Sequence, residues 1–217
     1  MKHIEVSYGV YSTPWTIRQA LKKLSSAPIL AFDTETRGLY TPAERKQAEK
    51  FLDTSDIPVD ILKVASLIAS SSGLSFPSLV HVTHFIFGIS ETESLICIAQ
   101  HPHEEVAIWN WIAEFPGLLA VHNSLFDLKL MYHRVKALPR NFEDTALMAK
   151  VLTNDADVWK SKVGLKDLMG HIYDPKWALY SNYEPEDLKD PAFLDYAAID
   201  GAATYRLYHE ITGGSHA

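Results

Sequence analysis

Cysteine is the scarcest chemically reactive residue in this sequence. Only Cys97 occurs among 217 residues, which excludes an internal disulfide and any cysteine-rich metal site. It lies in the apolar stretch 95–99, where we expect it to pack as a small hydrophobe. No apolar run approaches the length of a membrane span, and no basic-apolar leader opens the chain. These absences predict a protein that has no membrane partner and is located in the cytoplasm.

Positive charge is also in short supply. The chain has 20 Lys and Arg against 27 Asp and Glu, a formal net charge of −7. Proteins that wrap duplex DNA tightly rely on many basic contacts to phosphates, so the charge balance argues against that class. The negative net charge is still compatible with binding of a short single-stranded end that is held by metal ions and a few local contacts. The remaining composition, 47% hydrophobic and 22% charged, is that of an ordinary globular protein.

Short apolar stretches alternate with helical patterns along the chain. Several of the apolar stretches end in polar or acidic residues, which is typical of strands that deliver functional groups at their ends. We expect strands at 28–33, 82–89, 95–99 and 118–123, with a hairpin turn near 90–93. We expect helices after Thr13, at 103–115, around Asp127, from Asp144 and at 191–211. This order predicts an α/β fold built on a mixed central sheet flanked by helices.

No repeat, low-complexity tract or linker divides the chain, so we expect a single domain over residues 1–217. One excursion at about 41–77 interrupts the pattern with a charged helical stretch, a turn at Pro58 and an apolar stretch. Connections of this length are usually functional or mobile. Two interpretations stay open: a surface hairpin of helices, or a lid or partner-docking element beside a site.

Four acidic residues in three separated segments carry the strongest chemical signal: Asp33 and Glu35, Asp127, and Asp200. Each adjoins an apolar stretch, where a carboxylate is costly unless a proton, a partner or a metal compensates it. Alternate side chains of a strand share a face, so Asp33 and Glu35 point the same way. Carboxylates brought together repel one another, and a divalent cation relieves the repulsion. An oxygen-only ligand set favours Mg²⁺ or Mn²⁺, and two such ions suit phosphodiester hydrolysis.

The motifs occur in a recognisable order: Asp-x-Glu at 33–35, Asn-x-x-x-Asp at 123–127 and Tyr-x-x-x-Asp at 196–200. This set resembles the three exonuclease motifs of the DEDD superfamily of 3′–5′ exonucleases. The histidine branch of that superfamily has His five residues before the last aspartate, a position that Asp195 holds here. Tyr196 therefore favours the tyrosine (DEDDy) branch, and the first motif is most similar to the proofreading domain of DNA polymerase I. The resemblance covers about residues 1–212 and implies an RNase H-like fold, although 40–84 has no clear counterpart.

The resemblance implies a site for two divalent ions, Mg²⁺ or Mn²⁺. Asp33 would be shared by both ions, Glu35 and Asp200 would complete the first, and Asp127 would hold the second through water. Tyr196 would orient the attacking water. Its place four residues before Asp200 puts both on one helix face, although a core tyrosine would show the same spacing.

The resemblance also implies substrate contacts. Glu35 and the backbone at Thr36 would contact the terminal 3′-hydroxyl, and Lys166 would neutralise a phosphate. Leu39 would lie against the terminal base or simply pack. Asn123 would contact substrate, or serve only as a helix N-cap. Asp144 is expected as a helix cap or as a residue that supports the metal ligands.

These expectations describe an enzyme that hydrolyses single-stranded DNA from its 3′ end to nucleoside 5′-monophosphates, in proofreading or end trimming. No polymerase domain follows the motifs, so we expect a stand-alone enzyme or a separate subunit that works with a DNA polymerase, as in some phages in the host cytoplasm. RNA 3′-end processing by an RNase D-like enzyme is an alternative, although the helical domain expected after it is missing. A non-catalytic nucleic-acid-binding module is a further alternative, but such a module would be expected to have lost an acidic residue.

Overall fold

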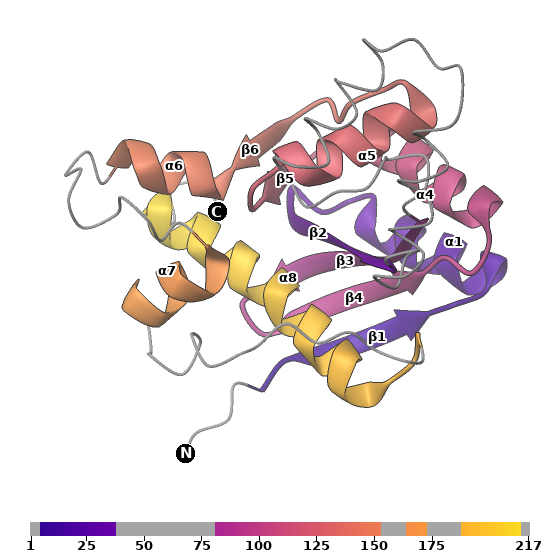
Figure 1. Cartoon of the computed structure of the whole chain (residues 1–217), viewed down its shortest axis with the longest axis horizontal. Coiled ribbons are helices and arrows are strands. Elements are labelled where there is room, and N and C mark those ends of the chain that lie inside the picture. Colours follow the sequence, from indigo (N-terminus) through magenta and orange to yellow (C-terminus); the bar gives the residue numbers. More distant parts are fainter. Residues whose placement is uncertain (1–4, 38–80, 153–163, 173–187, 214–217) are drawn as a thin grey trace, which may run out of the picture. The chain divides into compact units, whose positions relative to one another are not determined.

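A computed structural model describes residues 5–37, 81–152, 164–172 and 188–213 (Figure 1). The chain divides into two compact units, one formed by Met1–Glu35 with Thr83–Ala217 and the other by Thr36–Val82. The residues that carry the motifs belong to the first unit. The predicted excursion at 41–77 lies outside the described residues, and its helical hairpin or lid stays a prediction.

The sheet has six strands in the order β1-β4-β3-β2-β5-β6. Its members are β1 (Ser7–Tyr11), β2 (Ile29–Arg37), β3 (His81–Ser90), β4 (Glu93–Ile98), β5 (Leu118–Val121) and β6 (Phe142–Asp144). β3 and β4 form the predicted antiparallel hairpin, whereas β1–β4, β2–β5 and β5–β6 are parallel pairs. The prediction of a mixed central sheet is therefore confirmed.

Helices flank this sheet in Figure 1. They are α1 (Pro14–Leu24), α4 (Pro102–Glu114), α5 (Leu125–Val135), α6 (Thr145–Leu152), α7 (Leu165–Ile172) and α8 (Pro191–Ile211). Helix α1 begins after Thr13, as expected: the Thr13 hydroxyl caps it by accepting a hydrogen bond from the Thr16 amide at 3.2 Å, and Pro14 lies in the first turn. Among the described residues, every helix is too short or too polar to cross a bilayer.

Aromatic side chains form the core beneath the middle of the sheet. Phe32, Phe85, Phe87 and Trp109 are fully or almost fully buried. The ring centroids of Phe32 and Phe87 lie 5.5 Å apart, and those of Phe85 and Trp109 lie 4.8 Å apart in an edge-to-face contact. Because Phe32 anchors β2 in this core, the next residue, Asp33, is held at a fixed place where the strand leaves it.

The parallel strands β2, β5 and β6 bring three chain segments to one edge of the sheet. Their register aligns Phe32 with Val121, and Val121 with Asp144. The carboxyl ends of parallel strands meet at the same edge, which is where α/β sheets bind ligands. Asp33 and the turn before α5 are therefore neighbours in space, although they are distant in sequence.

Helix α8 crosses the sheet at very close range. A Cβ atom added to Gly88 would lie 2.2 Å from the carbonyl oxygen of Gly201. The Ser94 hydroxyl donates to the Ala198 carbonyl at 2.8 Å, which ties the helix to β4. Buried alanines at 197, 198, 202 and 203 give α8 a slim face toward the sheet. This close approach carries Tyr196 and Asp200 to the edge where β2 ends.

Candidate active site

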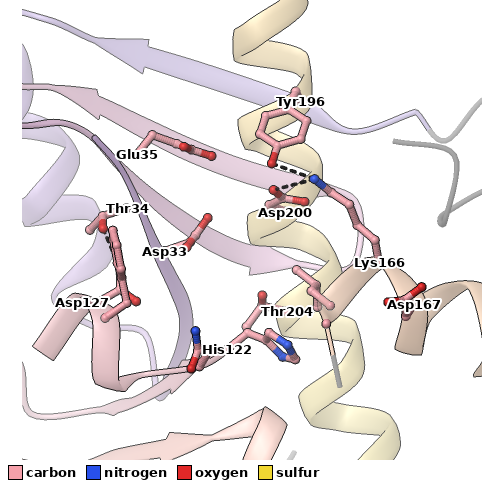
Figure 2. Close-up of a pocket in the computed structure, with 14 residues that line it drawn as sticks. Asp33, Thr34, Glu35, His122, Asp127, Lys166, Asp167, Tyr196, Asp200 and Thr204 are labelled. Carbon is pink, nitrogen blue, oxygen red and sulfur yellow. Dashed lines mark hydrogen bonds and ion pairs between the residues drawn. The ribbon is translucent and has the colours of Figure 1, made fainter. Parts of the chain in front are cut away.

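The five expected catalytic residues line one cavity of about 590 Å³. Asp33 and Glu35 come from β2, Asp127 from the first turn of α5, and Tyr196 and Asp200 from α8. Figure 2 shows their side chains converging from these elements, with Lys166 of α7 approaching from another side. Further residues complete the lining: Thr34, His122, Asn123, Phe126, Gly164, Leu165, Asp167 and Thr204.

Three carboxylates form a tight group in this cavity. Asp33, Glu35 and Asp200 each offer a carboxylate oxygen, and these atoms lie within 4.8 Å of one another. Burial, followed by the charges of Asp127, Glu35 and Asp200, raises the pKa of Asp33 well above its ordinary value. Burial and the charge of Asp200 raise the pKa of Glu35 to about 8, with Lys166 opposing the change. Asp33 and Glu35 therefore tend to stay protonated near neutral pH unless a metal cation compensates their charge.

A divalent cation fits this group better than protons do. Its donors are all carboxylate oxygens, the ligands that Mg²⁺ and Mn²⁺ prefer, and the described part of the chain places no thiolate beside them. Burial also raises the pKa of Asp200, while Lys166 and Tyr196 oppose the change. The repulsion among the carboxylates is therefore only partly compensated by the side chains around them.

Asp127 lies beside this group but is held separately. Its Oδ1 accepts a hydrogen bond from the Thr34 hydroxyl at 2.6 Å, drawn as a dashed line in Figure 2. Burial raises the pKa of Asp127 to about 7, and the Thr34 hydroxyl and nearby backbone oppose that rise. Asp127 also raises the pKa of Asp33, so the two carboxylates lie close enough to interact. An ion that bridged Asp33 and Asp127 would relieve this repulsion as well.

Tyr196 forms a hydrogen-bonded group with Lys166 and Asp200. The Lys166 Nζ donates to the Tyr196 hydroxyl at 2.6 Å and lies 3.7 Å from Asp200 Oδ2 (Figure 2). The same Nζ lies 3.9 Å from the centroid of the Tyr196 ring. Burial, followed by the charges of Asp200 and Glu35, raises the pKa of Tyr196 above its ordinary value. The Tyr196 hydroxyl is therefore neutral at physiological pH and acts as a hydrogen-bonding group.

The turn before α5 has a conformation that the sequence did not predict. Asn123 has a φ of 59°, in the left-handed region that Asn tolerates better than most residues, and the N-cap position falls to Ser124. The interpretation of Asn123 as an N-cap is therefore wrong. Its side chain is exposed and lines the cavity, a position from which it could contact a ligand.

Asp144 fastens this turn to the start of α6. Its carboxylate accepts hydrogen bonds from the Ser124 amide and the Ser124 hydroxyl, both at 2.8 Å, and from the Asn123 amide at 3.2 Å. It also caps α6 by accepting from the Ala146 amide at 2.9 Å. Burial raises the pKa of Asp144, but these hydrogen bonds outweigh burial and hold the pKa below its ordinary value. The expected cap thus also supports the segment that leads to Asp127.

A family model described as 3′-5′ exonuclease matches residues 84–213, more than half of the chain. The chain belongs to this 3′-5′ exonuclease family. The matched residues carry the second and third motifs, and the structure adds Asp33 and Glu35 of the first motif to the same cavity. Exonucleases of this family depend on divalent metal ions, which agrees with the oxygen donors described above.

Solved structures of other exonucleases share the fold. NrnC of Brucella melitensis has a TM-score of 0.58 and 15% identity, over 97% of this chain and 82% of that one. The catalytic core of RRP6 from Trypanosoma brucei has a TM-score of 0.61 and 11% identity, over 97% and 47%. RNase D of Escherichia coli has a TM-score of 0.57 and 13% identity, over 97% and 46%. The RNase H-like fold is confirmed. Among curated proteins, no sequence matches significantly.

The structure does not test the substrate contacts expected for three further residues of the exonuclease. Thr36 follows Glu35 on β2 and is not among the residues that line the cavity. Leu39 lies outside the described residues, so its contact with a terminal base stays a prediction. Lys166 lines the cavity but contacts Tyr196 and Asp200, so its contact with a phosphate also stays a prediction.

Sequence reasoning missed three residues that border the site of the exonuclease. Thr34 stands between two predicted ligands, and an alternating strand pattern would place its side chain on the opposite face. Phe126 precedes Asp127 and is half-buried at the cavity. Thr204 lies four residues after Asp200, a spacing that puts both on one face of α8 and was the available signal.

Proposed function

We propose that this exonuclease hydrolyses single-stranded DNA from its 3′ end and releases nucleoside 5′-monophosphates. The observation that carries the proposal is the convergence of the four motif carboxylates and Tyr196 on one cavity. The similarity of the first motif to the proofreading domain of DNA polymerase I supports DNA as the substrate.

In this proposal the carboxylates divide between two divalent ions. Asp33, Glu35 and Asp200 would hold one ion, because their oxygens already form a group within 4.8 Å. Asp127 would hold the other together with Asp33, whose pKa its charge raises. When bound, such ions stabilise negative charge on the oxygens of a scissile phosphodiester. The carboxylates would be fully ionised only in the metal-bound protein.

Tyr196 would orient the attacking water. Because its hydroxyl is neutral, it can donate or accept a hydrogen bond but does not serve as a strong base. Lys166 donates to the Tyr196 oxygen and thereby fixes the direction of the hydroxyl. Lys166 also lies at the cavity surface, from which its ammonium group could contact a phosphate of the strand.

The cavity suits a strand end better than a duplex. Lys166 is the one basic Lys or Arg side chain among the described lining residues, which is too little positive charge to hold a long duplex by its phosphates. Phe126 offers an aromatic surface on which an unpaired base could stack. We further propose that 41–77 is an insertion in a single exonuclease domain, and that a separate DNA polymerase subunit is a candidate partner.

RNA is a second candidate substrate, because one of the structures that share this fold is described as an exoribonuclease. RNase D of Escherichia coli is described as an exoribonuclease involved in structured RNA processing. One NrnC structure is bound to pGG. The preference for DNA or RNA would depend on whether the site near Glu35 accommodates a 2′-hydroxyl.

A gel assay would test the function and rank the substrates. The substrates are 5′-labelled single-stranded DNA and RNA of the same sequence, each with Mg²⁺, Mn²⁺ or a chelator. We expect a ladder that shortens from the 3′ end, requires metal and proceeds faster on DNA. Asp200→Ala should abolish it, whereas Asp195→Ala, on the same helix but outside the lining of the cavity, should not. Faster cleavage of RNA would favour RNA processing over DNA as the function. Cleavage of neither substrate would contradict the proposed exonuclease activity.

A further inference from the structure

We propose that Thr34 is a positioning residue that holds the Asp127 carboxylate in the orientation required for its metal ion. The inference rests on the proposed function, because it assumes that Asp127 is a metal ligand. It concerns a residue that none of the three motifs includes as a ligand or a substrate contact.

The contact between the two residues is short and buried. The Thr34 hydroxyl donates to Asp127 Oδ1 at 2.6 Å, within the range of a hydrogen bond to a charged acceptor. The exposed fraction is 5% for Thr34 and 1% for Asp127, so water cannot readily replace this bond. A buried carboxylate that loses a donor retains the full cost of its desolvation. The hydroxyl therefore has a large influence on where the carboxylate lies.

The position of Thr34 on β2 explains how it affects the rest of the site. The flanking residues Asp33 and Glu35 supply carboxylates directly, and the Thr34 hydroxyl contacts Asp127 of the second motif. One strand thus fixes ligands from two elements relative to each other. Thr34 follows directly on a well-fixed part of the strand, because β2 pairs with β5 up to Phe32 and Val121, and Phe32 is buried in the aromatic core.

Electrostatics make such a restraint necessary. Asp127 and Asp33 line the same cavity, and ionised carboxylates at close range repel one another, so the Asp127 side chain needs a restraint when no ion is bound. The β-branched side chain of Thr has few rotamers, which keeps the hydroxyl in place. The geometry thus preorganises Asp127 before an ion arrives.

The test compares Thr34→Val, which removes the hydroxyl and retains the shape, with Thr34→Ser, which retains the hydroxyl. Loss of a group that orients a ligand costs about 10- to 100-fold in metal affinity or activity. We expect Thr34→Val to lose affinity for the Mn²⁺ ion assigned to Asp127 and to lose kcat by such a factor, with KM little changed. Thr34→Ser should recover most of both. Mn²⁺ binding is measured by electron paramagnetic resonance of the free ion, in the presence of a nucleoside 5′-monophosphate.

Two further variants separate the possible outcomes. Asp127→Asn should lose the same Mn²⁺ as Thr34→Val. Thr212→Val removes a hydroxyl that donates to the Tyr208 carbonyl at 3.0 Å away from the cavity, and it should bind Mn²⁺ and cleave like the wild type. If Thr34→Val does not fold, Thr34→Ala against Thr34→Ser supplies the same comparison.

Wild-type binding and kcat in Thr34→Val, with an inactive Asp127→Asn, would overturn the positioning role and leave the exonuclease assignment intact. Equal losses in Thr34→Val and Thr34→Ser would also overturn it, because the hydroxyl would not be the cause. A wild-type protein that neither binds Mn²⁺ nor degrades nucleic acid would overturn the inference together with the proposed function.

Discussion

The ammonium group of Lys166 contacts two residues of the site, the Tyr196 hydroxyl and the Asp200 carboxylate. The ammonium group fixes the direction of the hydroxyl at 2.6 Å, and it supplies positive charge 3.7 Å from Asp200 Oδ2. Because the lysine lies on α7 and the tyrosine on α8, the contact also connects two helices at the cavity. A change of Lys166 should therefore affect both the direction of the Tyr196 hydroxyl and the contact between the two helices.

Tyr196→Phe isolates the role of the hydroxyl at the residue scale. The ring and its contact with the Lys166 ammonium remain, while the group that would orient water is lost. Contributions of positioned proton-transferring groups are typically about 10²- to 10⁴-fold, and we expect an orienting hydroxyl to lie at the lower end, with a decrease in kcat of about 100-fold and little change in KM. Steady-state kinetics on single-stranded DNA would measure this. Kinetics equal to the wild type at limiting metal would mean that Tyr196 is a core residue without a catalytic part.

At the scale of elements, the carboxylate of Asp144 connects the turn before α5 to the start of α6. It satisfies the Ser124 amide and hydroxyl and the Ala146 amide at once, so one side chain determines how two helices begin. Helix starts leave backbone amides without partners inside the helix, and a cap compensates some of them. The orientation of α5, and hence of Asp127, depends on this carboxylate.

Asp144→Ala should lower both stability and activity. Loss of a cap and of hydrogen bonds to a charged acceptor costs about 1–3 kcal/mol, which corresponds to roughly 2–4 °C per kcal/mol for a chain of this size. Thermal unfolding and Mn²⁺-dependent cleavage would be measured together. Thr13→Ala is the control, because it removes the cap of α1 at a residue that does not line the cavity, and it should lower stability without loss of cleavage. Equal retention of activity in both variants would contradict the role assigned to Asp144.

The close crossing of α8 over the sheet gives a second prediction at this scale. In Gly88→Ala the new Cβ would meet the Gly201 carbonyl oxygen at 2.2 Å, a contact with rigid backbone, so α8 must move. We expect a loss of stability of about 1–3 kcal/mol and weaker Mn²⁺ binding, because Asp200 moves with the helix. In Gly9→Ala the nearest atoms, at 3.0 Å and beyond, belong to side chains, and the effect should be smaller. Urea unfolding would compare the two, and equal losses would contradict the prediction.

At the scale of the whole molecule, the site links stability to pH and metal. Burial and Asp200 raise the pKa of Glu35 to about 8, and burial raises that of Asp127 to about 7, so the native state binds protons that the unfolded chain releases above about pH 4. The metal-free protein therefore loses stability from these groups as pH rises from about 4 to about 8. A divalent ion replaces the protons and removes this loss.

The increase in thermal midpoint caused by Mg²⁺ or Mn²⁺ should thus be small near pH 5 and grow towards pH 8. This difference is the appropriate measurement, because groups outside the site, such as His84, whose pKa burial lowers, contribute equally with and without metal. Thermal scans in chelator and in millimolar metal at several pH values would provide it. A metal effect that is independent of pH, or largest in acid, would contradict this linkage.

Local periodicity made most of the elements predictable. Alternation along a strand related Asp33 to Glu35, and helical spacing related Tyr196 to Asp200, so two parts of the site followed from neighbours in sequence. The bounds predicted for α8 agree with the structure, since a proline and apolar periodicity mark them. Strand β6 has only three residues, and no period can be recognised in so short a segment.

What the sequence did not reveal depends on contacts between distant segments. The hydrogen bond between Thr34 and Asp127 requires β2 and α5 to meet, and nothing near either residue indicates that partner. The left-handed Asn123 likewise depends on Asp144, 21 residues later, which holds the turn by its amides. Lys166 was expected at a phosphate because its family position suggested it, whereas the packing of α7 against α8 determines its contact with Tyr196.

The position of α8 near the end of the sequence determines when the active site can form during synthesis. Asp33 and Glu35 emerge early in synthesis, but Tyr196 and Asp200 belong to a helix that begins at Pro191. A nascent chain that has not reached this helix lacks two of the five catalytic groups that converge on the cavity. Nuclease activity should therefore appear only after synthesis has passed Asp200 and α8 has docked on the sheet.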